Sequence, residues 1–272
     1  MDLIKEIMPD IEEYFLLNNR GYIILEGYEW FRDIITLYAK QHQLVSATEL
    51  LLDNNMNEEA FFLARSIITN YFQIGYLLND KDGRRVKEYQ VQPWLNERFK
   101  YKQMKKMLEG DFGKYLKDSN KEFPIEIKEI NNKIKEIGKQ IKEKGFNVDK
   151  PPISVLKMAS QSVQYGFELY TLFYLEASKF EHSDIESLNI YKKAVEEIST
   201  NLAFIMDLNS TDTNIKDNII KVISICYFDS FLQIVQVICN REPQLRINYD
   251  IEKLKVIVAK IELFLLQNNI NV

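Results

Sequence analysis

Hydrophobic residues recur along this chain at alternating steps of four and three, which places their side chains on one face of an α-helix. The longest such stretch covers residues 21–53. Its apolar stripe consists of Ile24, Tyr28, Phe31, Ile35, Tyr38, Val45 and Leu52. His42 and Glu49 occupy the two positions in the stripe that lack an apolar residue. We therefore predict a long helix here, with His42 as a core residue whose polar atoms are satisfied.

The same reading predicts helices along most of the remaining chain. They are expected near residues 57–78, 94–109, 124–144, 153–162, 164–181, 185–207, 213–240 and 249–268. Asn57 is a candidate N-cap for the first of these. Glycine and proline together number only 15 of 272 residues, which favours long helices over strands and tight hairpins. The predicted fold is an all-α, multi-helix antiparallel bundle that forms a single domain over residues 1–272.

Charge divides the chain unevenly. Residues 98–144 contain 14 basic and 8 acidic side chains, whereas the remainder contains 21 basic and 32 acidic ones. We therefore predict that residues 93–148 form a basic helical hairpin inserted into, and projecting from, an acidic bundle. RNA is a possible partner of residues 98–144. However, lysine and glutamate interleave there without an arginine cluster or interleaved aromatics, which favours an ordinary solvated surface.

That hairpin also contains a seam of apolar residues at four-three spacing. The seam consists of Phe123, Ile127, Ile130, Ile134, Ile137 and Ile141. It is long enough to pack inside the chain or to pair with a second chain, and two to three heptads do not decide between these alternatives.

Several classes of protein are disfavoured by what the sequence contains. Two cysteines without a Cys-x-x-Cys pair and only two histidines predict no metal site. We find no glycine-rich phosphate loop, nucleophile elbow or dinucleotide fingerprint, so no cofactor is expected. The apolar run at 219–239 is interrupted by Lys221, Asp229, Gln233 and Gln236 and predicts a buried helix. With no signal peptide recognisable at the N-terminus, we expect a cytoplasmic protein that does not contact membranes.

Arg65 is the sharpest candidate for function. It is the only charged residue from Ala60 to Leu78, and it lies on the apolar side of its predicted helix, with Phe61 and Phe72 on one side of it and Tyr76 on the other. A guanidinium in that position needs an acidic partner, because an unpaired buried charge costs several kcal/mol. The alternatives are a structural ion pair or an anion-binding arginine. The candidate acids are Glu26, Glu29, Glu168 and Glu176.

A second candidate lies on the helix expected at 164–181. Tyr174, Ser178 and His182 follow one another at steps of four, so they share one side of that helix. Together with Arg65 and Glu176, they are candidates for a ligand-binding pocket. The alternative role of His182 is to cap the end of the helix, where an imidazole can bond the last carbonyl groups.

Two segments resemble a known family. The run Glu59-Ala60-Phe61-Phe62-Leu63-Ala64-Arg65-Ser66-Ile67-Ile68, with Gly75-Tyr76-Leu77-Leu78, resembles the arginine-bearing helix of an uncharacterised all-helical bacterial family. The pattern Tyr174-x-x-x-Ser178-x-x-x-His182-Ser183 resembles its second signature. Such relatives often carry an acid four residues after the arginine, where this chain has Thr69. If that acid normally pairs with the arginine, the partner of Arg65 must come from another helix.

A more distant similarity is to the HEPN class of helical bundles, many of which are metal-independent ribonucleases or ligand-binding modules. Their nuclease signature, an arginine followed four to six residues later by a histidine, is absent before His182. That absence argues against a standard ribonuclease of this class.

Three functions remain as hypotheses. The leading one is a non-enzymatic interaction or sensor module in bacterial antiviral defence or a prophage-borne system, with a protein partner or self-association as a homo-oligomer. The second is a metal-independent ribonuclease or toxin that uses His182 and Arg65 as catalytic residues. It requires the two side chains within about 10 Å of each other and Arg65 not sealed by an acid. The third is a pocket for an anionic small ligand.

Overall fold

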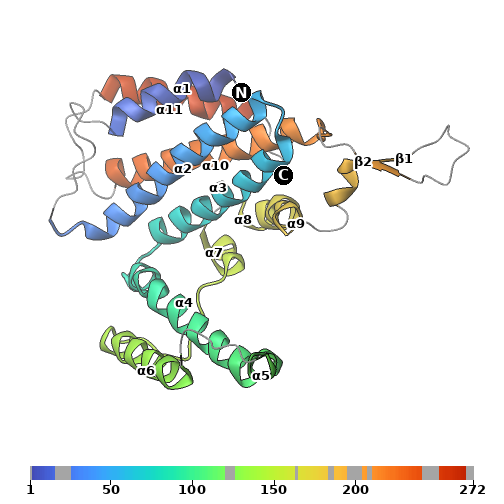
Figure 1. The fold of residues 1–272 in the computed structure, drawn as a ribbon. Helices are drawn as coiled ribbons and strands as arrows, with labels where there is room; N and C mark the ends of the chain where they lie inside the picture. The colour runs from blue at the N-terminus through green and yellow to red at the C-terminus, as the bar shows by residue number, and fades with distance from the viewer. Residues whose placement is uncertain are drawn as a thin grey trace, which may run out of the picture. The chain divides into compact units, whose positions relative to one another are not determined.

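The computed structural model describes residues 2–15, 26–119, 126–162, 165–182, 187–194, 204–206, 210–240 and 251–267. Apart from one short pair of strands, the elements in these ranges are helical (Figure 1), and the predicted all-α fold is confirmed. The chain divides into two compact units. One comprises Met1–Asn79 with Val155–Val272, and the other comprises Asp80–Ser154.

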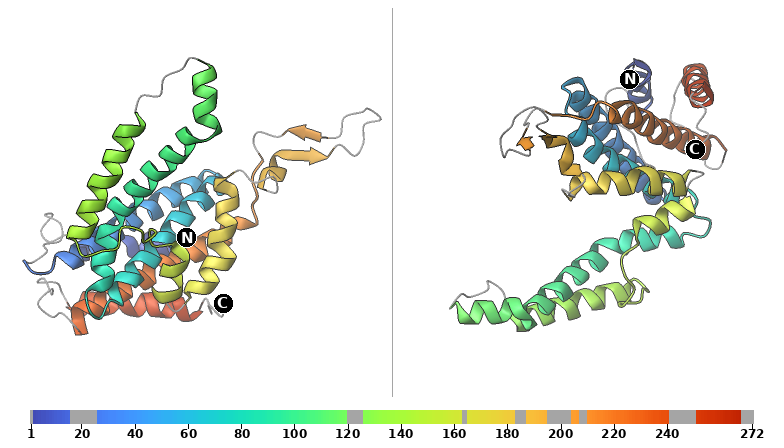
Figure 2. Two further views of the ribbon diagram at one scale, coloured as in Figure 1. Left: turned by 90° about the horizontal axis from the view of Figure 1, so that it is seen from below. Right: turned by 90° about the vertical axis from the view of Figure 1, so that its right-hand side faces the viewer.

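The larger unit contains most of the helices. They are α1 (Asp2–Phe15), α2 (Glu29–Asp53), α3 (Asn57–Leu78), α7 (Val155–Ser162), α8 (Gly166–Glu168), α9 (Leu175–Glu181), α10 (Ile215–Asn240) and α11 (Ile251–Gln267). Helices α2, α3 and α10 pack against one another, and α1 lies beside α11 on the outside (Figures 1 and 2). Two ion pairs join the outer helices, Lys260 with Glu6 and Lys253 with Glu13.

Helix α10 is largely buried in this unit, packed against α2, α3 and α11. It is the one helix in the described ranges that is long and apolar enough to cross a membrane. Within its most apolar stretch of 18 residues, however, 72% is buried inside the protein. The prediction of a buried helix is thus confirmed. Its polar residue Asp229 is satisfied within the core: Tyr71 donates to Asp229 Oδ2 at 2.7 Å, and Gln233 Nε2 donates at 2.6 Å.

His42 meets its prediction only in part, because the side chain is half-buried rather than fully in the core. Its Nδ1 lies 2.7 Å from the hydroxyl of Tyr227 on α10, and Tyr227 stacks on Tyr38 with a centroid distance of 5.3 Å. Burial lowers the pKa of His42, an effect that the nearby Glu12 partly opposes. The imidazole therefore favours its neutral form in the folded protein.

We expect this histidine to make the protein less stable in mild acid. Below about pH 6.5 the unfolded chain binds a proton at His42 that the folded state resists, so the free energy of unfolding falls as the pH falls. The slope cannot exceed about 1.4 kcal/mol per pH unit for one proton. Urea unfolding of wild type and His42→Gln at several pH values between 7.5 and 5 tests this. The stability of the wild type relative to the variant should decline on acidification, and a constant difference would contradict the assignment.

The smaller unit consists of α4 (Arg84–Glu109), α5 (Asp111–Asp118) and α6 (Ile127–Glu143). Its core joins Val91 and Leu95 of α4 to Ile137 and Ile141 of α6. The described part of the isoleucine seam therefore packs inside the chain, although Ile127 near its start is 39% exposed; Phe123 lies outside the described residues. Arg98 ties α4 to the segment after α6 by donating to the carbonyl of Val148 at 2.6 Å.

Several helix boundaries differ from those predicted. Helix α2 begins at Glu29 rather than residue 21; residues 21–25 of that prediction lie outside the described ranges. Helix α4 begins at Arg84 rather than 94, because Pro93 lies at an exposed position where the loss of one backbone donor is tolerated. Asn57 is the first residue of α3 and not its cap; its side chain donates to the carbonyl of Asp212 at 3.0 Å.

The helix predicted at 185–207 was wrong in its described parts. Ser187–Tyr191 is a 3₁₀ helix, and β1 (Lys192–Ala194) pairs antiparallel with β2 (Phe204–Met206), with Lys193 opposite Ile205. A short apolar run such as Phe204–Met206 fits a strand as well as a helix, so periodicity alone did not separate the two.

Candidate functional site

Arg65 of α3 binds three side chains of one facing helical stretch. Its Nε donates to Ser178 Oγ at 2.8 Å, one terminal nitrogen donates to the Tyr174 hydroxyl at 2.9 Å, and the other forms an ion pair with Glu181. The three acceptors recur at steps of four and three, so they form one row along the helix. Packing of α9 on α3 brings this row to the arginine (Figure 2).

Glu181 is the acid that the sequence analysis required but did not identify. The prediction that the partner comes from another helix is confirmed, while the candidates named for the role were wrong. Glu176, the nearest of them in sequence, is exposed and pairs with Lys179 at 3.1 Å. Glu181 was recognisable in principle, because it stands three residues after Ser178 and seven after Tyr174, on the same side of the helix.

Tyr174 lies at a distortion of the helix. Residues Leu169–Tyr174 form a π-helical turn between α8 and α9, a feature that often marks functional sites. Tyr170 and Tyr174 stack with centroids 5.2 Å apart, and the guanidinium carbon of Arg65 lies 4.6 Å from the Tyr174 ring centroid. Burial raises the pKa of Tyr174, so its hydroxyl keeps its proton near neutral pH. The phenol therefore supports Arg65 as a neutral acceptor.

Ser178 has no general base in the contacts that hold it. Its hydroxyl accepts from Arg65 and donates to the backbone carbonyl of Tyr174 at 2.9 Å. A nucleophilic serine instead needs a base that takes the proton from its hydroxyl. The serine thus belongs to the support of the arginine.

His182 takes a different position from the one that its spacing suggested. Helix α9 ends at Glu181, and His182 is the C-cap residue, with its backbone N–H bonded to the carbonyl of Ser178. Its side chain is 73% exposed, and Nε2 lies 3.8 Å from the same Glu181 oxygen that pairs with Arg65. His182 therefore flanks the arginine cluster at the surface and does not line its interior.

A nuclease site requires that Arg65 and His182 lie close together and that no acid seals Arg65; the first requirement is met and the second is not fully met. Arg65 and His182 both lie beside one oxygen of Glu181, so they are close together. The positive charge of Arg65, however, is already neutralised by that carboxylate, and the ion pair is only partly accessible, with 23% of the Arg65 side chain and 27% of the Glu181 side chain exposed. An arginine held in this way binds an anion only in competition with Glu181.

No group of three or more potential metal-binding side chains occurs in the described ranges. The polar cluster around Arg65 contains one carboxylate and one exposed imidazole, together with two hydroxyls that already bond the guanidinium. A guanidinium pairs well with a carboxylate or a phosphate, and here it is paired with the carboxylate of Glu181.

Fold and site together define an all-α protein with a partly buried arginine held between two helices. Sequence comparison places the chain in a family of unknown function, DUF5677, whose pattern matches residues 33–197, and the chain belongs to that family. The matched region includes both Arg65 and the row of side chains that binds it. No curated protein and no solved structure matches the chain.

Proposed function

We propose that this protein is a non-enzymatic interaction or sensor module whose sensing element is the Arg65–Glu181 ion pair. The observation that carries the proposal is that one guanidinium holds three side chains of residues 174–181. A change at that single cation therefore affects the whole end of the helix. A role in bacterial antiviral defence or a prophage-borne system is a further proposal, supported only by the resemblance to HEPN-type bundles.

An anionic ligand could change this ion pair by competing with Glu181 for Arg65. The three contacts engage three of the five guanidinium N–H groups, and the exposed edge of Arg65 gives access to the cation. A carboxylate or phosphate that binds there competes with Glu181. When Glu181 is released, the C-terminal turn of α9 loses its charged contact with α3. The signal is then a change in how stably residues 175–181 pack on α3. A partner protein that binds these residues would respond to that change.

The proposal is tested with inorganic pyrophosphate as the probe, by calorimetric titration of the full chain. Glu181→Gln removes the competing charge and is expected to bind pyrophosphate about fivefold more tightly than wild type, as the value of a partly exposed ion pair suggests. Arg65→Gln should lose binding. Glu176→Gln is the matched control, because Glu176 is an exposed acid on the same helix that does not contact Arg65. Absence of binding to both wild type and Glu181→Gln would contradict the proposal.

One observation favours a second function, metal-independent RNA cleavage. His182 and Arg65 flank a common carboxylate oxygen, which is close enough for an acid–base group and a phosphate-stabilising cation to act together. A labelled single-stranded RNA incubated with the purified protein separates the two functions. We expect no cleavage. Cleavage that disappears in both Arg65→Gln and His182→Gln, with folding preserved, would replace the sensor proposal with the ribonuclease.

A further inference from the structure

Helix α4 carries an exposed face that has no acidic residue. Its members lie at steps of three and four and are all exposed: Asn96, Phe99, Lys100, Gln103, Lys106 and Met107. The acids of α4 lie elsewhere on the helix at Glu88, Glu97 and Glu109. At 1.5 Å per residue, the face extends for about 17 Å from Asn96 to Met107. We call it the α4 face.

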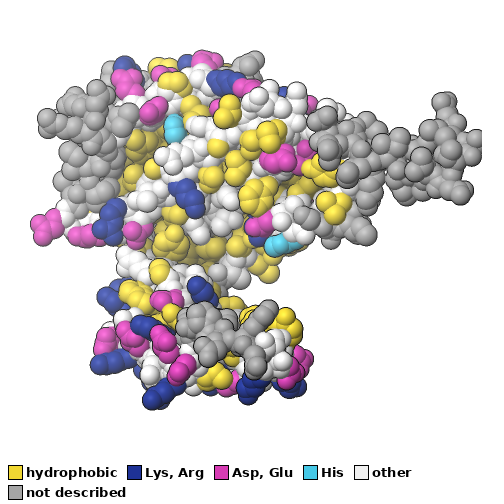
Figure 3. Space-filling model, viewed as in Figure 1, with side chains coloured by type: hydrophobic (Ala, Val, Ile, Leu, Met, Phe, Trp, Pro, Cys, Tyr) yellow, Lys and Arg dark blue, Asp and Glu magenta, His cyan; other side chains and the backbone are white. Residues whose placement is uncertain are grey.

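The lysines of this unit divide into those that form ion pairs and those that do not. Lys102, Lys105, Lys114, Lys133 and Lys139 each form an ion pair with an aspartate or glutamate. Among the described residues, Lys100 and Lys106 have no acidic partner within ion-pair distance. On the face of this unit that Figure 3 shows, basic and acidic side chains intermix. The α4 face therefore carries two lysines and no acid of its own, with Glu97 and Glu109 at its two margins.

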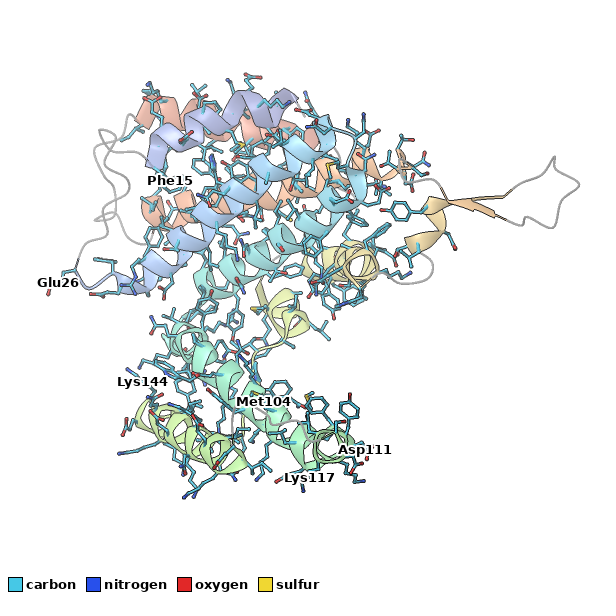
Figure 4. The ribbon with its side chains drawn as sticks, in the orientation of Figure 1. Phe15, Glu26, Met104, Asp111, Lys117 and Lys144 are labelled. Atoms are coloured by element: carbon cyan, nitrogen blue, oxygen red, sulfur yellow. The ribbon has the colours of Figure 1, made fainter. Side chains whose placement is uncertain are left out.

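Exposed aromatic side chains accompany these lysines. Phe99 is 52% exposed beside Lys100, and Phe112 and Tyr115 are exposed on α5. Figure 4 shows α5, labelled at Asp111 and Lys117, directly after α4. The turn at Gly110 brings α5 against the end of α4. This segment therefore does contain aromatic residues among its lysines, which the expectation of an ordinary solvated surface had left out of account.

We propose that the α4 face binds a single-stranded nucleic acid, with Lys100 and Lys106 contacting phosphates and Phe99 stacking on a base. Lysines that track a backbone, together with aromatic rings that stack on bases, are the combination used by proteins that bind single strands. An acidic helix from another protein fits less well. Such a helix requires a continuous apolar seam, and here Phe99 and Met107 are separated by polar positions.

The proposal is tested by fluorescence anisotropy of a labelled U12 RNA with the full chain over a series of salt concentrations. Lys100→Gln/Lys106→Gln should weaken binding and reduce the slope of log K against log salt by about 1.4, since each phosphate contact on a single strand contributes about 0.7. Phe99→Ala should weaken binding roughly tenfold without changing that slope, because stacking releases no counterions.

Lys128→Gln/Lys135→Gln is the matched control. It removes the same charge from exposed positions on α6, a helix that carries no aromatic residue. Its affinity should stay within twofold of wild type. Equal weakening by both double variants would overturn the proposal, because it would indicate attraction to net charge alone. The proposal would also be overturned if the RNA failed to bind while a labelled acidic helical peptide bound. These variants leave Arg65 intact, so the outcome is independent of the pyrophosphate titration.

Discussion

Replacing Arg65 with alanine is expected to lower the free energy of unfolding by about 3 kcal/mol, since hydrogen bonds to a charged group and a partly buried ion pair are lost together. The change removes the donor to Ser178 and to Tyr174 and leaves Glu181 without its cation. Glu181 is only 27% exposed, so water compensates its charge incompletely. Urea unfolding monitored by circular dichroism measures the effect.

Two comparisons make this result specific. Arg32→Ala removes an exposed arginine whose nearest acid, Asp33, lies 3.5 Å away, and should cost less than about 0.5 kcal/mol. The double variant Arg65→Ala/Glu181→Gln should be less destabilised than the sum of the two single variants. Arg65→Ala leaves the charge of Glu181 unpaired, and Glu181→Gln removes that charge. Strict additivity would show that the ion pair contributes nothing of its own.

Gly166→Ala is expected to destabilise the protein by about 2 kcal/mol, because the added methyl group has no room. A Cβ at Gly166 would lie 1.9 Å from the carbonyl oxygen of Ala159 on α7. Both sides of this contact are backbone, so α7 and the start of residues 166–181 must separate. The helical stretch that carries Tyr174 and Ser178 moves with them, and the contacts with Arg65 should weaken.

Gly138→Ala provides the opposite case in the same protein. Gly138 lies inside α6, and an added Cβ would meet only ordinary contacts, with Arg98 Nε at 3.6 Å and Val148 at 3.8 Å. Alanine is the better helix former by about 1 kcal/mol, so this variant should be slightly more stable than wild type. The pair is compared by urea unfolding under identical conditions. A stabilised Gly166→Ala would show that α7 does not constrain the site.

Local pattern was sufficient to identify the helices and the polar residues of the site. The four-three spacing predicted α6 closely, the expected helix at 57–78 matches α3, and the isolation of Arg65 among apolar residues indicated that it needed an acid. The spacing of Tyr174 and Ser178 predicted that they share a side, and both bind Arg65. His182 has the same spacing but lies beyond the end of α9, where periodicity no longer fixes direction.

The identity of the acid was decided by tertiary structure. Several glutamates had suitable sequence positions, and only the packing of α9 on α3 selects Glu181 and leaves Glu176 at the surface. The isoleucine seam was undecided for the same reason. The spacing of its isoleucines indicates that one face of the helix is buried. Which helix covers that face is decided by α4, which supplies Val91 and Leu95.

The sequence by itself thus determined the helical class, the positions that must be buried, and the presence of one cation that requires a partner. These properties follow from the period of the α-helix and from the cost of burying a charge, both of which act over a few residues. Tertiary structure alone decided which acid pairs with Arg65, how far His182 lies from the interior, and that Phe99 and Lys100 are exposed together. Those outcomes depend on which helices meet, and that is set by packing between segments far apart in the chain.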